Sequence, residues 1–290
     1  SISVRSPADL PDKAELIERT RKMIDGVLQL RDAPMFDQPY TGPVLFEAPV
    51  ATSLFDSMFA DRFAGGQRPV GSRTSPDDFV NKLNRRILPR FMDVVDDPSI
   101  KELDGVPVLG NYTYDDQGVP AERVQLVEDG RLKSLLMSRN PSKEFPHSNG
   151  HGRGTYSPSP GPGCMIVTAD PALSHDELIE ELLDAAQDEG LEYGIRIARL
   201  NGSRPIGMFK VFPDGHQELF RGAELGRFDI KPFKRMLAAG DKLHVSNTGG
   251  NAWYTIACPA FLFEELDIAK IDQDFNKPPI LPNPMAREKQ

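Results

Sequence analysis

The sequence of 290 residues contains little cysteine, a single tryptophan and no long hydrophobic run. Its two cysteines, Cys164 and Cys258, are far apart and neither belongs to a CxxC pair. This pattern excludes a disulfide scaffold and a zinc ribbon. The longest apolar run, around Ile256 to Phe263, is far shorter than the roughly 18–20 residues that a membrane span needs. With 39% hydrophobic residues, the chain is still able to bury a substantial core.

Positive charge is also scarce. The 34 Lys and Arg residues are outnumbered by 43 Asp and Glu residues, which gives a formal net charge of −9. A phosphate backbone repels such a surface, so the composition argues against nucleic-acid binding. The opening residues do not resemble a signal peptide, and we expect a cytoplasmic location. A secreted origin, with an earlier segment removed by processing, is the alternative.

Hydrophobic periodicity predicts an α+β order of elements rather than strict βαβ alternation. Helices are predicted at 7–31, 51–63, 79–87, 175–189 and 232–239. Strands are predicted at 44–46, 91–95, 106–109, 123–127, 132–138, 193–199, 207–212 and 218–221, with a long strand or a strand pair at 255–268. Loops are predicted at 64–78 and 140–163, and the proline-rich tail from residue 277 is predicted to be extended. We expect an antiparallel β-sheet sandwich or partly closed barrel with a few covering helices.

The helix at 175–189 carries the clearest local signal. Ser174 and Glu177 have the spacing of a capping box, in which each side chain bonds the other residue's backbone N–H. Leu173 and Leu178 are placed to form a hydrophobic staple, and Gly190 is a typical residue for ending a helix.

Two neighbouring carboxylates, Asp115 and Asp116, lie in the sequence Tyr-Asp-Asp-Gln-Gly at 114–118. Adjacent carboxylates before a glycine can hold a cation or orient a polar substrate. Asp and Gly are also the residues that a β-turn prefers, and this explanation needs no ligand.

A glycine-rich loop follows at 147–153, with the sequence His-Ser-Asn-Gly-His-Gly-Arg. Its two histidines, His147 and His151, are four residues apart, but a helix that would align them as metal ligands is not expected here. The backbone N–H groups and Arg153 can instead bind a carbonyl or carboxylate. The alternative is a flexible, solvated loop.

Three further residues have both a functional and a structural explanation. Cys164 is a candidate nucleophile if His151 lies nearby as a base, although a small buried side chain is the usual role of such a cysteine. Glu47 precedes a predicted helix, where the helix dipole alone favours a carboxylate. Trp253 and the adjacent Tyr254 can line a groove, but aromatic residues more often belong to the core.

The order of these motifs resembles the TldD/PmbA family, also called TldD/TldE. Four features match in order: Asn-Tyr-Thr-Tyr-Asp-Asp-Gln-Gly at 111–118, Val-Pro-Ala-Glu-Arg at 119–123, Leu-Val-Glu-Asp-Gly-Arg-Leu-Lys-Ser-Leu-Leu-Met-Ser-Arg at 126–139 and Ser-Asn-Gly-His-Gly-Arg at 148–153. The resemblance covers roughly residues 40–270. It implies that residues 1–40 form a helical linker from a missing or truncated N-terminal domain, and that residues 41–290 form the family's C-terminal domain.

The resemblance also implies a metallopeptidase system. TldD-type subunits hold zinc with an HExxxH helix and a late cysteine, and PmbA-type subunits pair with them but lack the metal site. Here the two histidine positions are Phe46 and Ala51, which offer no lone pair, and Pro49 is expected to interrupt the helix. Glu47 keeps the position of the general base. The late ligand would fall within 247–251, where there is no cysteine.

We therefore expect a subunit without its own zinc, and with no other cofactor, in an assembly that binds or processes unfolded peptides. The expected partner is a TldD/PmbA-family subunit, in a homo- or hetero-oligomer, and zinc is expected only in a TldD-like partner. The expected peptide-binding residues are Asp115, Asp116, Ser148, Asn149, Gly150, His151 and Arg153. The alternative is an active peptidase with a rearranged site built from His147, His151 and the Asp115–Asp116 pair.

Overall fold

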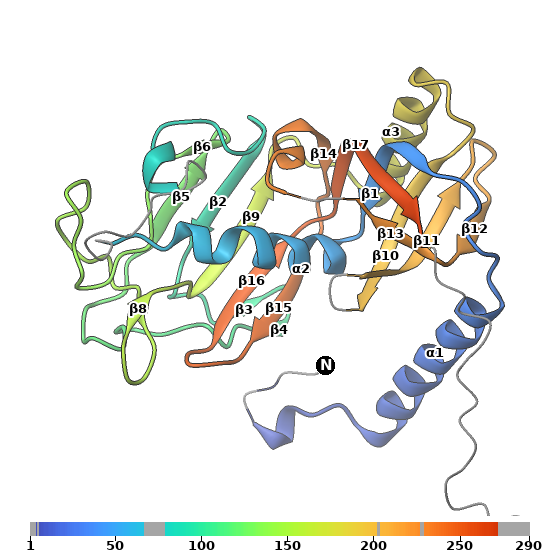
Figure 1. Ribbon diagram of the computed structural model, residues 1–290. Helices are drawn as coiled ribbons and strands as arrows, with labels where there is room; N and C mark the ends of the chain where they lie inside the picture. Colours follow the sequence, from blue (N-terminus) through green and yellow to red (C-terminus); the bar gives the residue numbers. More distant parts are fainter. Residues whose placement is uncertain (1–3, 5, 67–78, 202–203, 227–228, 272–290) are drawn as a thin grey trace, which may run out of the picture.

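The protein is described by a computed structural model, which covers residues 4, 6–66, 79–201, 204–226 and 229–271. Two β-sheets lie next to each other (Figure 1). The first sheet has the order β12 (Gln217–Phe220), β11 (Arg204–Val211), β10 (Gly194–Asn201), β1 (Tyr40–Phe46), β17 (Phe261–Lys270) and β13 (Ala223–Leu225), and β14 (Met236–Ala239) also pairs with β17. The second has the order β15 (His244–Thr248), β16 (Tyr254–Cys258), β9 (Cys164–Ala169), β2 (Met92–Asp96), β5 (Val124–Glu128) and β6 (Arg131–Leu132).

Most strand pairs are antiparallel, which confirms the expected α+β class. Each large sheet also contains one parallel pair, β1 with β10 and β9 with β16. Two small hairpins complete the strands: β3 (Glu102–Leu103) with β4 (Val106–Pro107), and β7 (Gly152–Arg153) with β8 (Ser159–Pro160). Over the described residues both sheets remain open and neither forms a closed barrel. This agrees with the expected partly closed arrangement.

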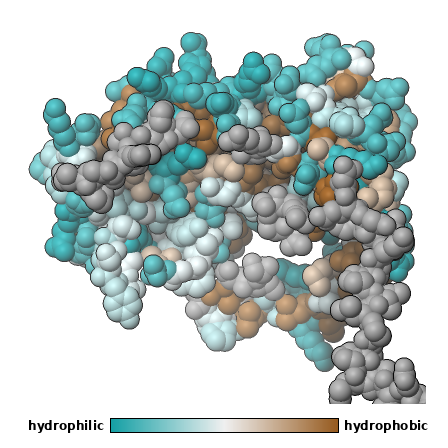
Figure 2. All heavy atoms as spheres, in the orientation of Figure 1, coloured by the Kyte–Doolittle hydropathy of each residue, from teal (hydrophilic) through white to brown (hydrophobic). Residues whose placement is uncertain are grey.

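The first long helix, α1 (Lys13–Asp32), lies at the outside of the molecule, next to β12 of the first sheet (Figures 1 and 2). It begins where the Asp12 side chain accepts a hydrogen bond from the Glu15 N–H, and a short 3₁₀ turn, η1 (Pro7–Asp9), precedes it. None of its residues is buried. The strand β1 then begins at Tyr40, and the division of the chain into a linker and a C-terminal domain stays a prediction.

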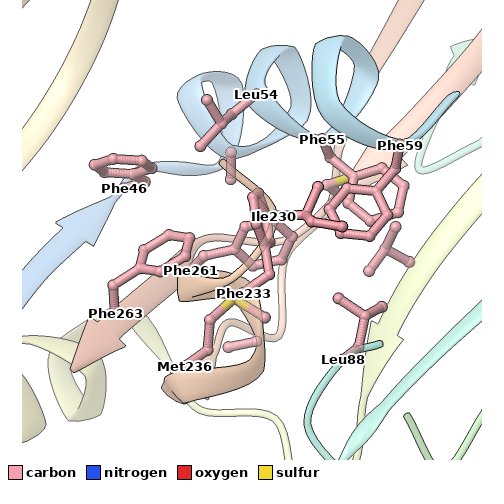
Figure 3. Packing of buried hydrophobic residues seen from close by; sticks show 14 of the residues in the cluster. Phe46, Leu54, Phe55, Phe59, Leu88, Ile230, Phe233, Met236, Phe261 and Phe263 are labelled. Carbon is pink, nitrogen blue, oxygen red and sulfur yellow. The ribbon is translucent and has the colours of Figure 1, made fainter. Parts of the chain in front are cut away.

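The helix α2 (Ala48–Phe59) follows β1 directly and packs against β10, β15 and β16, so it connects the two sheets. Its Leu54, Phe55 and Phe59 recur at helical spacing and face the main core (Figure 3). The Phe55 and Phe59 rings stack at 4.7 Å, and the 3₁₀ turn η2 (Ala60–Phe63) continues the helix. The expectation that Pro49 interrupts this helix is wrong. Pro49 lies in the first helical turn, where its missing N–H would have had no partner in the helix.

The opposite face of the first sheet is covered by α3 (His175–Asp188). Side chains alternate between the two faces of the sheet along β1, so both faces need a cover. Leu45 packs with Leu178 and Leu182 of α3, whereas its neighbours on β1 belong to the main core. The capping box of Ser174 and Glu177 is confirmed in both directions.

Two predicted helices are wrong for most of their length. Residues 232–239 form only a 3₁₀ turn, η4 (Pro232–Arg235), before β14 continues the chain beside β17. Residues 79–87 form only η3 (Phe79–Lys82), because Asn84 adopts a left-handed conformation with φ of 62° that ends the turn. Residues 255–268 are a strand pair, and the two strands belong to different sheets. Most of the predicted loop at 64–78, and the predicted tail, lie outside the described residues.

Candidate functional site

The two positions at which the family resemblance would place histidine ligands lie inside the hydrophobic core. Phe46 and Ala51 are fully buried, and the ring of Phe46 lies 5.1 Å from that of Phe263 (Figure 3). In the segment expected to hold the late ligand, the Asn247 amide bonds the Pro107 carbonyl, the Leu109 N–H and the Thr255 hydroxyl. These residues do not fit a zinc ion, because hydrocarbon side chains, and an amide whose oxygen already accepts two hydrogen bonds, replace the ligand atoms. The described residues contain no group of three or more His, Cys, Asp or Glu that could hold a metal.

Glu47 forms an ion pair at the junction of β1 and α2. Its Oε1 lies 2.7 Å from Nη1 of Arg196 on β10, and its Oε2 lies 3.8 Å from Nδ1 of His175 on α3. Arg196 is itself fixed by two hydrogen bonds to Gln217 and by the ring of Phe209, 4.4 Å away. Glu47 makes no side-chain bond to the start of α2, so the ion pair, more than a cap, accounts for its position.

The Asp-Asp turn and the glycine-rich loop, which are more than thirty residues apart in sequence, are joined by hydrogen bonds. Asp115 Oδ2 accepts the Gly152 N–H at 2.8 Å, and Asp116 Oδ2 accepts the Gly154 N–H at 2.7 Å. The other oxygen of Asp115 accepts the backbone N–H groups of Gln117 and Val119. Both carboxylates therefore accept hydrogen bonds from backbone N–H groups of the turn or the loop. Their role in peptide binding stays a prediction.

His151 is fully buried, and both of its ring nitrogens face oxygen atoms. Nε2 lies 3.2 Å from Oδ1 of Asp96, and Nδ1 lies 2.9 Å from the Asn149 carbonyl oxygen. Asp96 is fully buried as well and accepts the N–H groups of Gly163 and Cys164. A carbonyl and a carboxylate are both acceptors, so each ring nitrogen of His151 lies against a group that favours an N–H donor. Neither nitrogen is free to bind a metal.

Arg153 lies at the far end of the same loop and points toward the turn between β15 and β16. Its guanidinium carbon lies 3.9 Å from the centre of the Tyr112 ring, and Nη2 donates to the Trp253 carbonyl at 2.8 Å. Its Nη1 is 4.0 Å from Asp116, and its buried Nε has no hydrogen-bond partner within the described part of the chain. Burial raises the pKa of the Tyr112 hydroxyl, which donates to the Gly150 carbonyl. The Trp253 side chain is 48% exposed, so its assignment to the core is wrong.

Ser148 and Asn149 occupy a different side of the loop, at a groove of about 540 Å³. The Asn149 side chain accepts the Met137 N–H and donates to the Leu135 carbonyl, as a neighbouring strand would. Ser148 donates to the Met137 carbonyl. The facing wall consists of residues 122–125, including the first half of β5.

The groove follows an unpaired edge of β5. Val124 and Gln125 pair with β2 on one side, while β6 pairs with β5 only at Val127 and Glu128. Among the described residues, no strand lies on the other side of Val124 and Gln125. The groove therefore runs beside the part of β5 that has no second strand partner among the described residues. At its ends the Glu122 N–H donates to the Asn149 carbonyl and the Leu126 carbonyl accepts the Lys133 N–H. A sheet edge of this kind is where an extended peptide can add as a strand.

Neither cysteine has the environment of a nucleophile. Burial, with a smaller contribution from the nearby Asp96 carboxylate, raises the pKa of the Cys164 thiol to about 12. Burial raises the pKa of the Cys258 thiol well above its ordinary value. Both thiols are therefore protonated at neutral pH, and the structural explanation holds for each.

Sequence reasoning missed two buried or half-buried acids. Asp96 ends a strand in which Met92 and Val94 also face inward, so an acid at this inward position was a detectable signal. Asp56 lies on α2, where burial raises its pKa and both carboxylate oxygens lie within 3.2 Å of the Tyr254 hydroxyl. No sequence pattern indicated that contact, because the two residues are 198 positions apart.

Two open, mainly antiparallel sheets with a helix between them define an α+β domain, and comparison with known proteins places it in a family. Residues 39–206 match the PmbA/TldA metallopeptidase C-terminal domain family. Because this match covers more than half of the chain, the chain belongs to that family. Among the described residues, no helix is long and apolar enough to cross a membrane.

Two curated relatives are metalloproteases. The one from Archaeoglobus fulgidus is 34% identical over 109 residues, which is 36% of this chain and 23% of that protein. The one from Methanothermobacter thermautotrophicus is 34% identical over 115 residues, which is 39% of this chain and 24% of that protein. The aligned region thus spans about a quarter of each relative.

Solved structures share the fold at low sequence identity. A putative modulator of a DNA gyrase from Thermotoga maritima matches with a TM-score of 0.67 and 19% identity, over 92% of this chain and 57% of that one. TldE from Thermococcus kodakarensis matches with a TM-score of 0.62 and 17% identity, over 86% of this chain and 54% of that one. The chain spans about half the length of each.

Proposed function

We propose that this chain is a metal-free subunit of a PmbA/TldD-type peptidase assembly, in which it holds an unfolded peptide in the groove beside β5. The observation that carries the metal-free part is the burial of Phe46 and Ala51 in the core, together with the ion pair that engages Glu47. A zinc-bound water is what lowers the barrier to peptide hydrolysis in such enzymes, and no residue at these positions is able to hold the ion.

The geometry of the groove supports the peptide-binding part. Peptides commonly add as a strand to an exposed sheet edge, where backbone hydrogen bonds give affinity and neighbouring side chains give selectivity. In this proposal Val124 and Gln125 offer their free edge, and Ser148 and Asn149 form the facing wall. The glycine-rich loop is held in place by the contacts of Asp115, Asp116, Gly150 and His151. Arg153, at the other end of the loop, is a further polar contact.

The partner in this proposal is another subunit of the same family, and the peptide-cleaving zinc belongs to that subunit. The structural likeness to TldE supports this arrangement at the level of fold. The two unpaired cysteines are consistent with a reducing compartment, so the proposal keeps the expected cytoplasmic location.

Metal analysis tests the first part. The purified chain, dialysed against micromolar zinc, should retain far less than one zinc per chain and should not cleave unfolded peptides without a partner. About one tightly held zinc per chain, together with cleavage, would favour the alternative of a rearranged active site. The buried contacts of His151 argue against that alternative, because both of its nitrogens are occupied.

A groove-filling variant tests the second part. Ser134 lines the groove, so Ser134→Phe should block an added strand and weaken the binding of an unfolded, fluorescently labelled casein peptide by at least tenfold. Ser157→Phe is the matched control, because Ser157 is exposed on another loop and does not line the groove. Arg153 lies outside this groove, on the side of the loop that faces Trp253, so Arg153→Ala tests a second contact with the peptide there. Losing a charge-assisted hydrogen bond at that contact should weaken peptide binding by about 1–3 kcal/mol, and unchanged binding would restrict the site to the groove. Equal binding by the wild type and Ser134→Phe would refute the location of the site.

A further inference from the structure

The backbone of Gln125 faces the groove beside β5. In the neighbouring strand β2, the Met92 carbonyl accepts the Gly130 N–H, so every second residue from Met92 directs its backbone groups toward β5. Asp96 is such a residue, and it lies opposite Val124. The backbone groups of Val124 are therefore directed at β2, and those of the next residue, Gln125, are directed at the groove.

The side chains that line the groove differ between the two faces of the sheet. Val124 is 6% exposed and belongs to the main core, whereas the Gln125 side chain lies on the opposite, partly exposed face. Met137 belongs to the same core cluster as Val124, and Phe145 is partly buried against it. Both residues also line the groove. The groove thus has an apolar floor on the side of Val124 and a polar rim at Gln125 and Arg123.

We propose that the groove selects unfolded peptides by one large apolar side chain. A peptide residue that bonds the backbone of Gln125 directs its side chain away from the core, and its neighbour beside Val124 directs its side chain toward Met137 and Phe145. Residues opposite each other share one face of a sheet in parallel and antiparallel pairs alike, so this holds for either direction of the peptide. The inference rests on the proposed peptide-binding function and adds the class of peptide, which has a large apolar residue between polar neighbours.

The length of the open edge limits this recognition to one side chain. Two residues beyond Val124, the position opposite Leu126 is already taken, because the Leu126 carbonyl accepts the Lys133 N–H at 2.8 Å. In the other direction, the Glu122 N–H donates to the Asn149 carbonyl at 3.3 Å. In the described part of the chain, the groove therefore offers a single apolar position on the core side of the sheet.

Fluorescence anisotropy of short labelled peptides with the full chain tests this selection. The probes are peptides of Ser, Asn and Gln that share one sequence except for a central Leu, Ala or Asp. The Leu peptide should bind at least tenfold more tightly than the Ala peptide, because its larger apolar side chain leaves water. The Asp peptide should bind no better than the Ala peptide. A peptide with two adjacent Leu residues should bind within about threefold of the single-Leu peptide, because the second side chain faces the polar rim.

A substitution in the apolar floor separates the side-chain site from the backbone edge. Phe145→Ala should reduce the preference for Leu over Ala to below about threefold and should leave the binding of the Ala peptide within about threefold of the wild type. Phe212→Ala is the matched control, because Phe212 is also partly buried but packs on Tyr193 and His216, away from the groove. A benzophenone at the central peptide position needs no variant, and it should cross-link to residues 134–149.

The outcomes distinguish this inference from the proposed function. Equal binding of the Leu and Ala peptides, or an unchanged preference in a folded Phe145→Ala variant, would overturn the inference while peptide binding itself remains. Failure of these peptides and of the casein peptide to bind would overturn both. Cross-linking outside residues 122–125 and 134–149 would overturn the position of the apolar site.

Discussion

The pair of Asp96 and His151 provides a strong test of how the glycine-rich loop is held. Replacing Asp96 by Asn removes the negative charge and keeps the size of the side chain. Nε2 of His151 then loses its carboxylate partner at 3.2 Å in a place where water does not reach. The N–H groups of Gly163 and Cys164 also compete for one remaining oxygen instead of two.

The expected loss of stability follows from burial. Both side chains are fully buried, and leaving a buried donor without its acceptor costs about 1–3 kcal/mol. The His151 ring and the N–H groups of Gly163 and Cys164 all face the Asp96 carboxylate, and Asn offers one acceptor oxygen, so Asp96→Asn should cost about 3 kcal/mol. With a urea dependence of about 2 kcal/mol per molar, the unfolding midpoint should fall by about 1.5 M.

Urea unfolding followed by circular dichroism measures this loss. Asp93→Asn is the matched control on the same strand, because Asp93 accepts one N–H at the surface, and it should cost about 1 kcal/mol or less. His151→Gln and the double variant complete a cycle, whose coupling energy should exceed about 1 kcal/mol. A cost below 1 kcal/mol for Asp96→Asn, or additive effects in the cycle, would show that this pair does not fix the loop.

Three further predictions follow from other contacts. Glu47→Gln keeps an acceptor for Arg196 and should change the peptidase activity of the assembly less than tenfold, whereas a loss of 100-fold or more would reveal a general base. Burial raises the pKa of Asp56, so its stabilising contribution is complete below the unfolded pKa near 3.9 and is lost as pH rises through the folded pKa. Asp56→Asn should therefore gain stability relative to the wild type between pH 4 and 7, and exposed Asp61→Asn, as the control, should not. Ser174→Ala should cost about 1 kcal/mol in thermal or urea unfolding, and no measurable cost would contradict the observed capping box.

Local signals in the sequence predicted the elements that depend on local chemistry. The capping box at Ser174 and the turn at Asp129–Gly130 between β5 and β6 appear as expected, because neighbours in sequence determine them. The predicted helix at 232–239 failed for the opposite reason. Its second half pairs with β17, and this distant partner outweighs a weak helical preference.

The candidate site shows the same limit. The resemblance identified the Asp-Asp turn and the Ser-Asn-Gly loop, and the structure joins them through the contacts of Asp115 and Asp116. It did not indicate that His151 would be buried against Asp96, because the two residues are 55 positions apart and four strands lie between them in the sequence. Nor did it indicate that Ser148 and Arg153, five residues apart, would serve opposite sides of the loop.

Glu47 shows why a residue at a family's catalytic position need not indicate catalysis. Phe46 and Ala51 lie in the core, and neither side chain can hold the metal-bound water on which a general base between them would act. It still joins the end of β1 to Arg196 on β10 and faces His175 at the start of α3. Three elements that meet at one junction then share one carboxylate. That contact gives Glu a structural role at this position that needs no metal.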